Sequence, residues 1–168
     1  MINLAQALIQ KSGLSVLVID ADLRRPRAHA ILGAKASPGL VEYLRGEVDD
    51  TDIIQFGRIG QIDSLCFIAS GTRVENPSEL LSNGRFETLL RRLIPVFDWI
   101  LIDSPPCLPV ADTNILADLS DGVLIVARAG STPSASLQKA QQQLQKKNVV
   151  GMVLNAAQEK LGAYRTYY

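Results

Sequence analysis

Short apolar runs alternate with amphipathic segments along this chain. The runs are rich in valine, isoleucine and leucine, which is typical of strands buried on both faces of a parallel sheet. The predicted strands cover residues 16–19, 65–69, 99–102, 122–127 and 149–154. Other segments place apolar residues three and four positions apart, and this spacing predicts helices. The predicted helices cover residues 2–10, 78–81, 86–94, 113–119 and 136–147.

The alternation of strands and helices predicts βαβ units with right-handed crossovers. We therefore expect the α/β class, as a three-layer sandwich in which helices cover a mostly parallel sheet of about five strands. Residues 38–63 have the least regular pattern, with one helical turn expected at 40–44. We expect this stretch to form an excursion beside the sheet edge.

Length and charge narrow the classes of function. The 168 residues suit one domain, and 17 basic residues balance 17 acidic ones. The chain therefore has no net field to hold nucleic acid or an anionic membrane surface, and any anion must bind locally. The two cysteines lack metal-ligand spacing, which argues against zinc. Neither a membrane span nor a signal peptide is evident, which predicts a cytoplasmic location.

Acidic residues follow two of the predicted strands. Asp20 and Asp22 follow the first apolar run, and Asp103 follows the run at 99–102. Ligands of parallel sheets bind at the carboxyl ends of the strands, and carboxylates there suit Mg²⁺ with nucleotide phosphates. Arg24 and Arg25 can neutralise the phosphates or the acids themselves. A single aspartate at a strand end is also an ordinary turn or cap residue, but two matched strand ends favour a site.

Tyrosines gather at the end of the sequence. Three of the four lie in the last five residues, at Tyr164, Tyr167 and Tyr168. One interpretation is a phosphorylation substrate, and the other is a frayed end whose aromatic rings cover an apolar patch. We accordingly divide the chain into a domain over residues 1–163 and a flexible tyrosine-rich tail over 164–168.

The strings VLVIDADLRRP (16–26) and ILIDSPP (100–106) resemble the Walker A′ and Walker B motifs of the bacterial tyrosine kinases of capsule and exopolysaccharide synthesis. These kinases are relatives of the Walker A′ ATPases that position plasmids and division sites. The resemblance covers essentially the whole chain and implies a P-loop NTPase-like fold. The Arg-Pro after Asp-Ala-Asp and the tyrosine cluster separate the kinases from the partition ATPases. Further matching strings are GLVEYLRGE, NPSELL, PVADTNILADLSDGVLIVARAG and GMVLN.

The resemblance implies catalytic roles for the three acids. Asp20 and Asp22 would act at Mg²⁺ and the transferring phosphate of ATP, one of them as a candidate acceptor of the tyrosine proton. Asp103 would hold Mg²⁺ through water, so that Asp20 and Asp103 form the metal site. Phosphoryl transfer depends mainly on positioning and charge neutralisation, which these groups can supply.

Three further residues resemble positions that contact the nucleotide. Arg24 would lie near the phosphates, Arg128 would lie near the same ligand, and Asn155 resembles the position whose amide reads adenine. From the sequence alone, Arg128 is equally a solvated strand terminus, and Asn155 is equally an ordinary turn residue at a strand end.

The resemblance also implies partners and a location. Tyr164, Tyr167 and Tyr168 would be autophosphorylation sites offered to a neighbouring subunit of a homo-oligomer. Further partners would be a membrane polysaccharide co-polymerase or adaptor, either a separate protein or an N-terminal domain, and a cognate tyrosine phosphatase. The protein would lie in the cytoplasm at the inner face of the plasma membrane through that partner. No nucleic acid is expected.

The glycine-rich phosphate loop of this class is missing from the 168 residues, which contain no GxxxxGK[ST] string. The resemblance begins just after that loop, so we expect the chain to be truncated and to lack the strand leading into it. A vacant central strand would expose apolar surface on two neighbours. We therefore expect an autokinase domain that is inactive alone. The alternatives are a non-catalytic interaction or phospho-acceptor module and a partition ATPase fragment of the MinD or ParA type.

Overall fold

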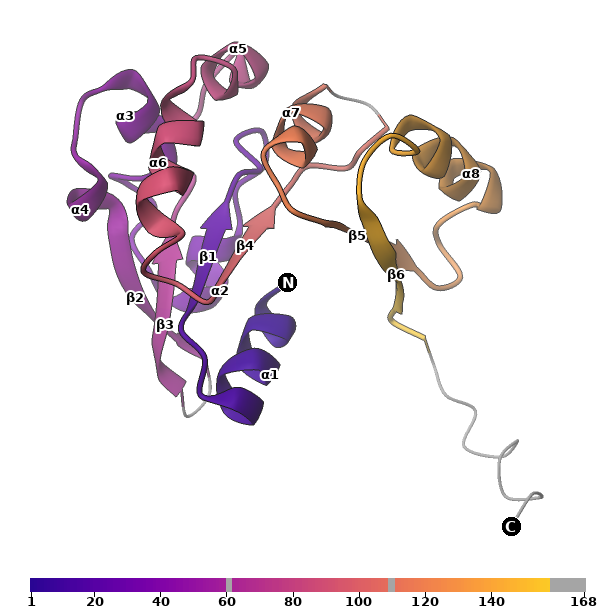
Figure 1. Cartoon of the computed structure of the whole chain (residues 1–168), viewed down its shortest axis with the longest axis horizontal. Coiled ribbons are helices and arrows are strands. Elements are labelled where there is room, and N and C mark those ends of the chain that lie inside the picture. Colours follow the sequence, from indigo (N-terminus) through magenta and orange to yellow (C-terminus); the bar gives the residue numbers. More distant parts are fainter. Residues whose placement is uncertain (60–61, 109–110, 158–168) are drawn as a thin grey trace. The chain divides into compact units, whose positions relative to one another are not determined.

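The computed structural model describes residues 1–59, 62–108 and 111–157 of the chain (Figure 1). It divides the chain into two compact units, Met1–Leu119 and Ser120–Tyr168. The helices of the first unit are α1 (Ile2–Ser12), α2 (Ala28–Leu32), α3 (Leu40–Arg45), α4 (Asp50–Ile53), α5 (Pro77–Leu81), α6 (Arg85–Leu93) and α7 (Asp112–Asp118). The prediction of one domain over residues 1–163 stays a prediction, and the tail at 164–168 lies outside the described residues.

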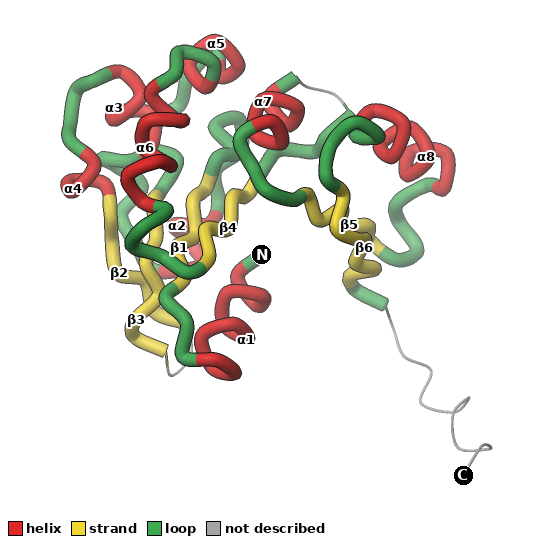
Figure 2. Tube along the Cα trace, viewed as in Figure 1, coloured by secondary structure: helices red, strands yellow, loops and turns green. Residues whose placement is uncertain are grey.

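A mixed sheet forms the centre of the first unit (Figure 2). Its strands are β1 (Val16–Asp20), β2 (Ile54–Ile59), β3 (Ile62–Ile68) and β4 (Trp99–Asp103), in the order β2-β3-β1-β4. β1 runs parallel to β3 and β4, whereas β2 runs antiparallel to β3. All five residues of β1 are buried, as its unbroken apolar run predicts.

Helices cover both faces of this sheet (Figure 1). Side chains alternate between the faces, so Leu17 and Ile19 pack with residues of α3, α5, α6 and α7. Val16 and Val18 pack on the opposite face with residues of α1 and α2. This arrangement of helix, sheet and helix confirms the predicted α/β class and its three layers.

The second unit contains one βαβ motif. Its elements are β5 (Val123–Arg128), α8 (Ser134–Gln143) and β6 (Val149–Asn155), and β5 runs parallel to β6. Its buried apolar side chains include Ile125, Ala127, Ala140 and Leu144.

The five predicted strands are all present, but their pairing differs from a single parallel sheet. Among the described residues, β4 pairs only with β1, and β5 pairs only with β6. β2 was not predicted, because its sequence has no continuous apolar run. It contains Gly57, and its Phe56 is 77% exposed. Trp99 of β4 is 49% exposed and Val126 of β5 is 59% exposed. The vacant strand position stays a prediction.

A buried glutamate ties α3 to the segment that follows β3. The Gly39 N–H donates to Oε2 of Glu42 at 2.7 Å, and the Thr72 N–H donates to Oε1 at 2.9 Å. A Cβ atom at Gly39 would stand only 2.5 Å from the Gly71 nitrogen, so glycine permits this close approach of two backbones. Burial raises the pKa of Glu42, but the hydrogen bonds from Thr72 and Gly39 outweigh it and hold the pKa below its usual value.

Glu42→Gln is expected to lower the free energy of unfolding by about 2 kcal/mol at neutral pH, because charged hydrogen bonds to two backbone N–H groups are lost. Since the pKa is depressed in the folded state, this stabilisation exists above the unfolded pKa and disappears as pH falls through the folded one. Urea unfolding at pH 7 and at acid pH should therefore show a difference between wild type and variant that shrinks at acid pH. Glu47→Gln, at an exposed side chain, is the control, and an equal loss there would contradict the role of Glu42.

Candidate functional site

The predicted acids meet at the carboxyl edge of the sheet in the first unit. The parallel register of β1 and β4 places Asp20 opposite Asp103. The Ala21 N–H donates to the Asp103 carbonyl oxygen at 2.9 Å, which continues the strand pairing beyond Asp20. Asp22 follows two residues later in the same loop. The expected juxtaposition of the two strand ends is therefore confirmed, while the chemical roles of these acids stay predictions.

The carboxylate of Asp20 is buried and organises the loop after β1. Its Oδ1 accepts a hydrogen bond from the Asp22 N–H at 3.3 Å, and its Oδ2 accepts one from the Ala28 N–H at 3.1 Å. The Ser70 hydroxyl donates to the Asp20 carbonyl oxygen at 2.8 Å. Asp20 is only 1% exposed, so its oxygens face the loop backbone more than solvent.

Asp22 is half-buried and closes a local turn. Its Oδ1 accepts hydrogen bonds from the backbone N–H groups of Arg24 at 3.2 Å and Arg25 at 3.0 Å. The turn interpretation of a single strand-end aspartate thus holds for Asp22. The same hydrogen bonds fix the direction in which its carboxylate points, so a turn role and a ligand role are compatible.

Negative charge accumulates around Asp103. Burial raises the pKa of its carboxyl group, and the nearby charges of Asp20 and Asp22 raise it further, against the lowering influence of the amino group of Met1. Like charges raise a carboxyl pKa because the second ionisation must occur in the field of the first. A divalent cation would relieve this repulsion, since it attracts every carboxylate at the edge.

The donor set fits magnesium better than a metal held by protein alone. Within residues 1–59, 62–108 and 111–157, no group of three or more His, Cys, Asp or Glu side chains could hold a metal ion. Mg²⁺ is usually bound through one or two carboxylates, with waters and substrate phosphates completing its octahedron. Asp20 and Asp103 supply hard oxygen ligands of this kind, and the remaining positions would need water and phosphate.

Arg24 reaches from the loop after β1 to a carboxylate on another helix. Its Nε and Nη2 donate to Oδ2 and Oδ1 of Asp112 at 2.7 Å and 3.2 Å. The Ser78 hydroxyl also donates to Oδ1 of Asp112. Burial raises the pKa of Asp112, but the hydrogen bonds from Arg24 and Ser78 outweigh it and hold the pKa below its usual value. The ion pair of Arg24 is therefore with Asp112, which the sequence did not single out, and its predicted contact with phosphate or with the strand-end acids stays a prediction.

Arg128 and Asn155 belong to the second unit. The Arg128 N–H donates to the Thr132 hydroxyl at 2.9 Å, at the turn that follows β5. Oδ1 of Asn155 accepts the Ala156 N–H at 2.8 Å, as an ordinary turn residue at a strand end does. Their contacts with a nucleotide stay predictions. Tyr164, Tyr167 and Tyr168 lie outside the described residues.

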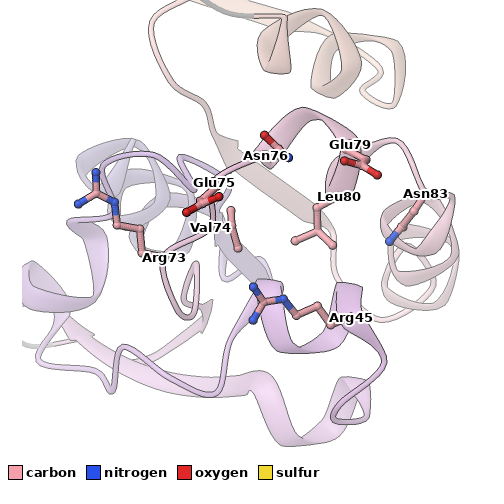
Figure 3. Close-up of a pocket in the computed structure, with 8 residues that line it drawn as sticks. All are labelled: Arg45, Arg73, Val74, Glu75, Asn76, Glu79, Leu80 and Asn83. Atoms are coloured by element: carbon pink, nitrogen blue, oxygen red, sulfur yellow. The ribbon is translucent and has the colours of Figure 1, made fainter.

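A groove of about 570 Å³ opens between α3, α5 and the segment before α5 (Figure 3). A neighbouring cavity shares Arg73, Val74 and Glu75 with it and reaches Arg24, so the groove adjoins the loop that carries Asp22. Its charged lining balances basic against acidic side chains, which does not favour a polyanion. The polar residues that line it are Arg45, Arg73, Glu75, Asn76, Glu79 and Asn83.

Comparison with known proteins places this fold in a defined class. The family described as "AAA domain" matches residues 1–157. Among solved structures, the kinase domain of VpsO matches with a TM-score of 0.84 and 31% identity, covering 94% of this chain and 76% of that one. The kinase domain of Escherichia coli ETK matches with a TM-score of 0.84 and 32% identity, covering 94% and 62%. The cell division ATPase MinD of Pyrococcus furiosus matches with a TM-score of 0.73 and 25% identity, covering 90% and 63%.

Curated relatives of the chain are named tyrosine-protein kinases. "Tyrosine-protein kinase CpsD" of Streptococcus agalactiae is 33% identical, covering 98% of this chain and 72% of that protein. "Putative tyrosine-protein kinase AmsA" of Erwinia amylovora is 37% identical, covering 94% of this chain and 22% of that protein. The chain belongs to the bacterial tyrosine-protein kinase family of AAA domains. It spans about a fifth of the length of several of these relatives. None of the helices in the described residues is long and apolar enough to cross a membrane.

Two residues of the site were not singled out from the sequence. Ser78 and Asp112 occur within strings that carry the family resemblance, NPSELL and PVADTNILADLSDGVLIVARAG, but neither follows a predicted strand. Their roles depend on contacts between residues far apart in the sequence, because Asp112 pairs with a residue 88 positions away. The available hint was a polar residue at the start of a predicted helix, for Ser78, or just before one, for Asp112, and such residues are common at ordinary helix starts.

Proposed function

We propose that this chain forms the acid-bearing part of an ATP-dependent protein-tyrosine autokinase. The observation that carries the proposal is the register that sets Asp20 opposite Asp103, beside Asp22, in a chain of the tyrosine-protein kinase family. The requirements of phosphoryl transfer support it, since positioning and charge neutralisation provide most of the catalysis.

The three acids would divide the work according to their surroundings. Asp20 and Asp103 would hold Mg²⁺, Asp103 through water, and the ion would neutralise charge on the phosphates of ATP. Asp22 is the better candidate to accept the tyrosine proton, because the carboxylate of Asp20 would be engaged with Mg²⁺, whereas Asp22 is only half-buried. Arg24, Arg128 and Asn155 remain the proposed contacts of the nucleotide.

The biological setting follows from the resemblance described above. We propose that the kinase regulates the synthesis and export of capsular polysaccharide or exopolysaccharide. It would work at the inner face of the plasma membrane with a polysaccharide co-polymerase or adaptor, a cognate phosphatase and further copies of itself. Tyr164, Tyr167 and Tyr168 would be its phospho-acceptors, each phosphate adding roughly 1.5 to 2 negative charges.

The purified chain alone is expected to bind ATP weakly, because its 168 residues contain no GxxxxGK[ST] string to wrap the phosphates. Joining the chain to the phosphate-loop segment of the S. agalactiae kinase should tighten Mg²⁺-dependent ATP binding about ten-fold or more, measured by titration calorimetry. Tight binding by the chain alone would contradict the expected dependence on the loop. Failure of the joined protein to bind MgATP would contradict the proposed function.

A second candidate is a non-catalytic phospho-acceptor module of the same fold. The observation that favours it is again the missing phosphate-loop string beside a sequence that keeps three terminal tyrosines. The coding sequence upstream of residue 1 separates the two candidates. An in-frame GxxGxGK[ST] would complete a kinase, whereas a stop codon would favour the acceptor module.

A further inference from the structure

The side chain of Arg24 links three elements of the first unit. Its guanidinium makes a two-pronged contact with Asp112 in the first turn of α7, at 2.7 Å and 3.2 Å. Its Nη2 also lies 3.5 Å from the hydroxyl of Ser78 in α5. Ser78 in turn donates to Asp112, so Arg24, Asp112 and Ser78 form a closed triangle that we call the clasp. The clasp fastens the loop after β1 to both α5 and α7.

The backbone of Arg24 leads directly to the acid edge. Its N–H donates to Oδ1 of Asp22, and the N–H of Arg25 donates to the same oxygen. The position of these two donors fixes the rotation of the Asp22 carboxylate. A chain of contacts therefore runs from Asp112, through the Arg24 guanidinium and backbone, to the Asp22 oxygen.

We propose that Asp112 is a positioning residue, which orients Asp22 by anchoring Arg24. The proposal rests on the proposed function, in which Asp22 lies beside the Mg²⁺ site and accepts the tyrosine proton. In this role Asp112 and Ser78 act through Arg24 rather than as ligands of substrate or metal. Their task is to hold the loop so that Asp22 is preset before the nucleotide arrives, as outer-shell partners do for metal ligands.

The chemistry of the clasp suits orientation better than stability. The side chain of Asp112 is only 1% exposed, whereas that of Arg24 is 38% exposed. Burial of a carboxylate costs desolvation free energy, and the attraction of its partners offsets that cost only approximately. Such a pair therefore adds little net stability compared with apolar packing. Its two-pronged geometry does add direction, because the planar guanidinium meets both carboxylate oxygens at once.

The decisive variant is Asp112→Asn, which keeps the size of the side chain and removes its charge. Amide exchange followed by NMR on the purified 168-residue chain should show the Arg24 and Arg25 amides exchanging about ten-fold faster, because these hydrogen bonds open more often. Amides of Leu17 and Val18 in β1 should keep their wild-type rates. In a titration with Mn²⁺ as the probe, the concentration that half-broadens the Asp22 amide signal should rise about two-fold, because the Asp22 carboxylate attracts the cation at the edge without being one of its ligands.

Two further variants distinguish a loss of the clasp from a general loss of folding. Ser78→Ala keeps the ion pair and removes both hydrogen bonds of the Ser78 hydroxyl, so it should give the same changes at smaller size. Arg92→Gln is the matched control, because it breaks the exposed Arg92–Asp50 ion pair of 2.9 Å on α6 and α4. It should leave both the loop amides and the Mn²⁺ titration unchanged.

The outcomes separate this inference from the function on which it rests. Unchanged exchange at Arg24 and Arg25 in Asp112→Asn would overturn the positioning role, and so would faster exchange throughout β1. Faster loop exchange with an unchanged Mn²⁺ midpoint would also overturn it, because Asp22 would then be oriented without the clasp. A wild-type chain whose Asp22 amide does not respond to Mn²⁺ would instead count against the proposed function.

Discussion

Asp103→Asn is expected to lower the rate of tyrosine phosphorylation about 100-fold in the protein joined to a phosphate-loop segment, since removing one preorganised electrostatic group typically costs this much. Asparagine keeps the size of the side chain and its place opposite Asp20. It removes the charge that would hold Mg²⁺ through water. Incorporation of labelled phosphate at saturating MgATP measures the change.

A matched aspartate precedes the opposite end of the same strand. Asp98 accepts hydrogen bonds from the Ser15 N–H at 2.8 Å and the Ser15 hydroxyl at 2.7 Å, and these interactions lower its pKa. Asp98→Asn should therefore weaken local hydrogen bonding and leave the phosphorylation rate unchanged. Equal losses in the two variants would indicate that β4 had been disturbed as a whole. A wild-type rate for Asp103→Asn would remove Asp103 from the proposed mechanism.

The edge of acids was predictable because it depends on local patterns and on one general rule. Unbroken apolar runs identify β1 and β4 as strands of a parallel sheet, and right-handed βαβ crossovers point both strands in the same direction. Acids that follow such strands must share an edge of the sheet. No contact between distant side chains is needed for this argument, which explains why it holds for Asp20 and Asp103.

The clasp and β2 were not predictable for the opposite reason. The partner of Arg24 lies 88 residues away, and nothing near Asp112 in the sequence indicates a basic neighbour. Within the part of the chain that the structure describes, β2 is an edge strand that pairs only with β3. Its side chains therefore need not be buried on both faces, and its apolar pattern is interrupted. Both features depend on which surfaces the folded chain brings together.

Asp22 and Asn155 show that an ordinary structural role does not argue against a functional one. Each side chain accepts a hydrogen bond from a backbone N–H close to it in sequence, as turn residues do. For Asp22 this turn also directs the carboxylate at an edge shared with two other acids. A turn at a strand end can thus hold a polar side chain in a fixed orientation. A candidate ligand-binding residue is distinguished from an ordinary turn residue only when a second strand end carries matching chemistry.

Replacing Tyr164, Tyr167 and Tyr168 together with phenylalanine is expected to abolish phosphorylation of this chain by an intact kinase of the family. The wild-type chain, mixed with the S. agalactiae tyrosine-protein kinase and MgATP, should gain phosphate on these residues by mass spectrometry. The reason is chemical, because phosphoryl transfer to tyrosine requires a hydroxyl in line with the γ-phosphate, and three of the four tyrosines of the chain are Tyr164, Tyr167 and Tyr168.

The fourth tyrosine supplies the matched control. Tyr43 is only 4% exposed in the core of the first unit, and the guanidinium of Arg85 stacks 5.0 Å from its ring centre. Its hydroxyl could reach a kinase site only if α3 unpacked, so Tyr43→Phe should leave phosphate incorporation at the wild-type level. Phosphate on Tyr43, or undiminished incorporation in the triple variant, would contradict the tail as acceptor. Loss in the triple variant alone would identify the terminal tyrosines as the substrate whether or not the chain is itself a kinase, because the phosphate donor in this experiment is a separate enzyme.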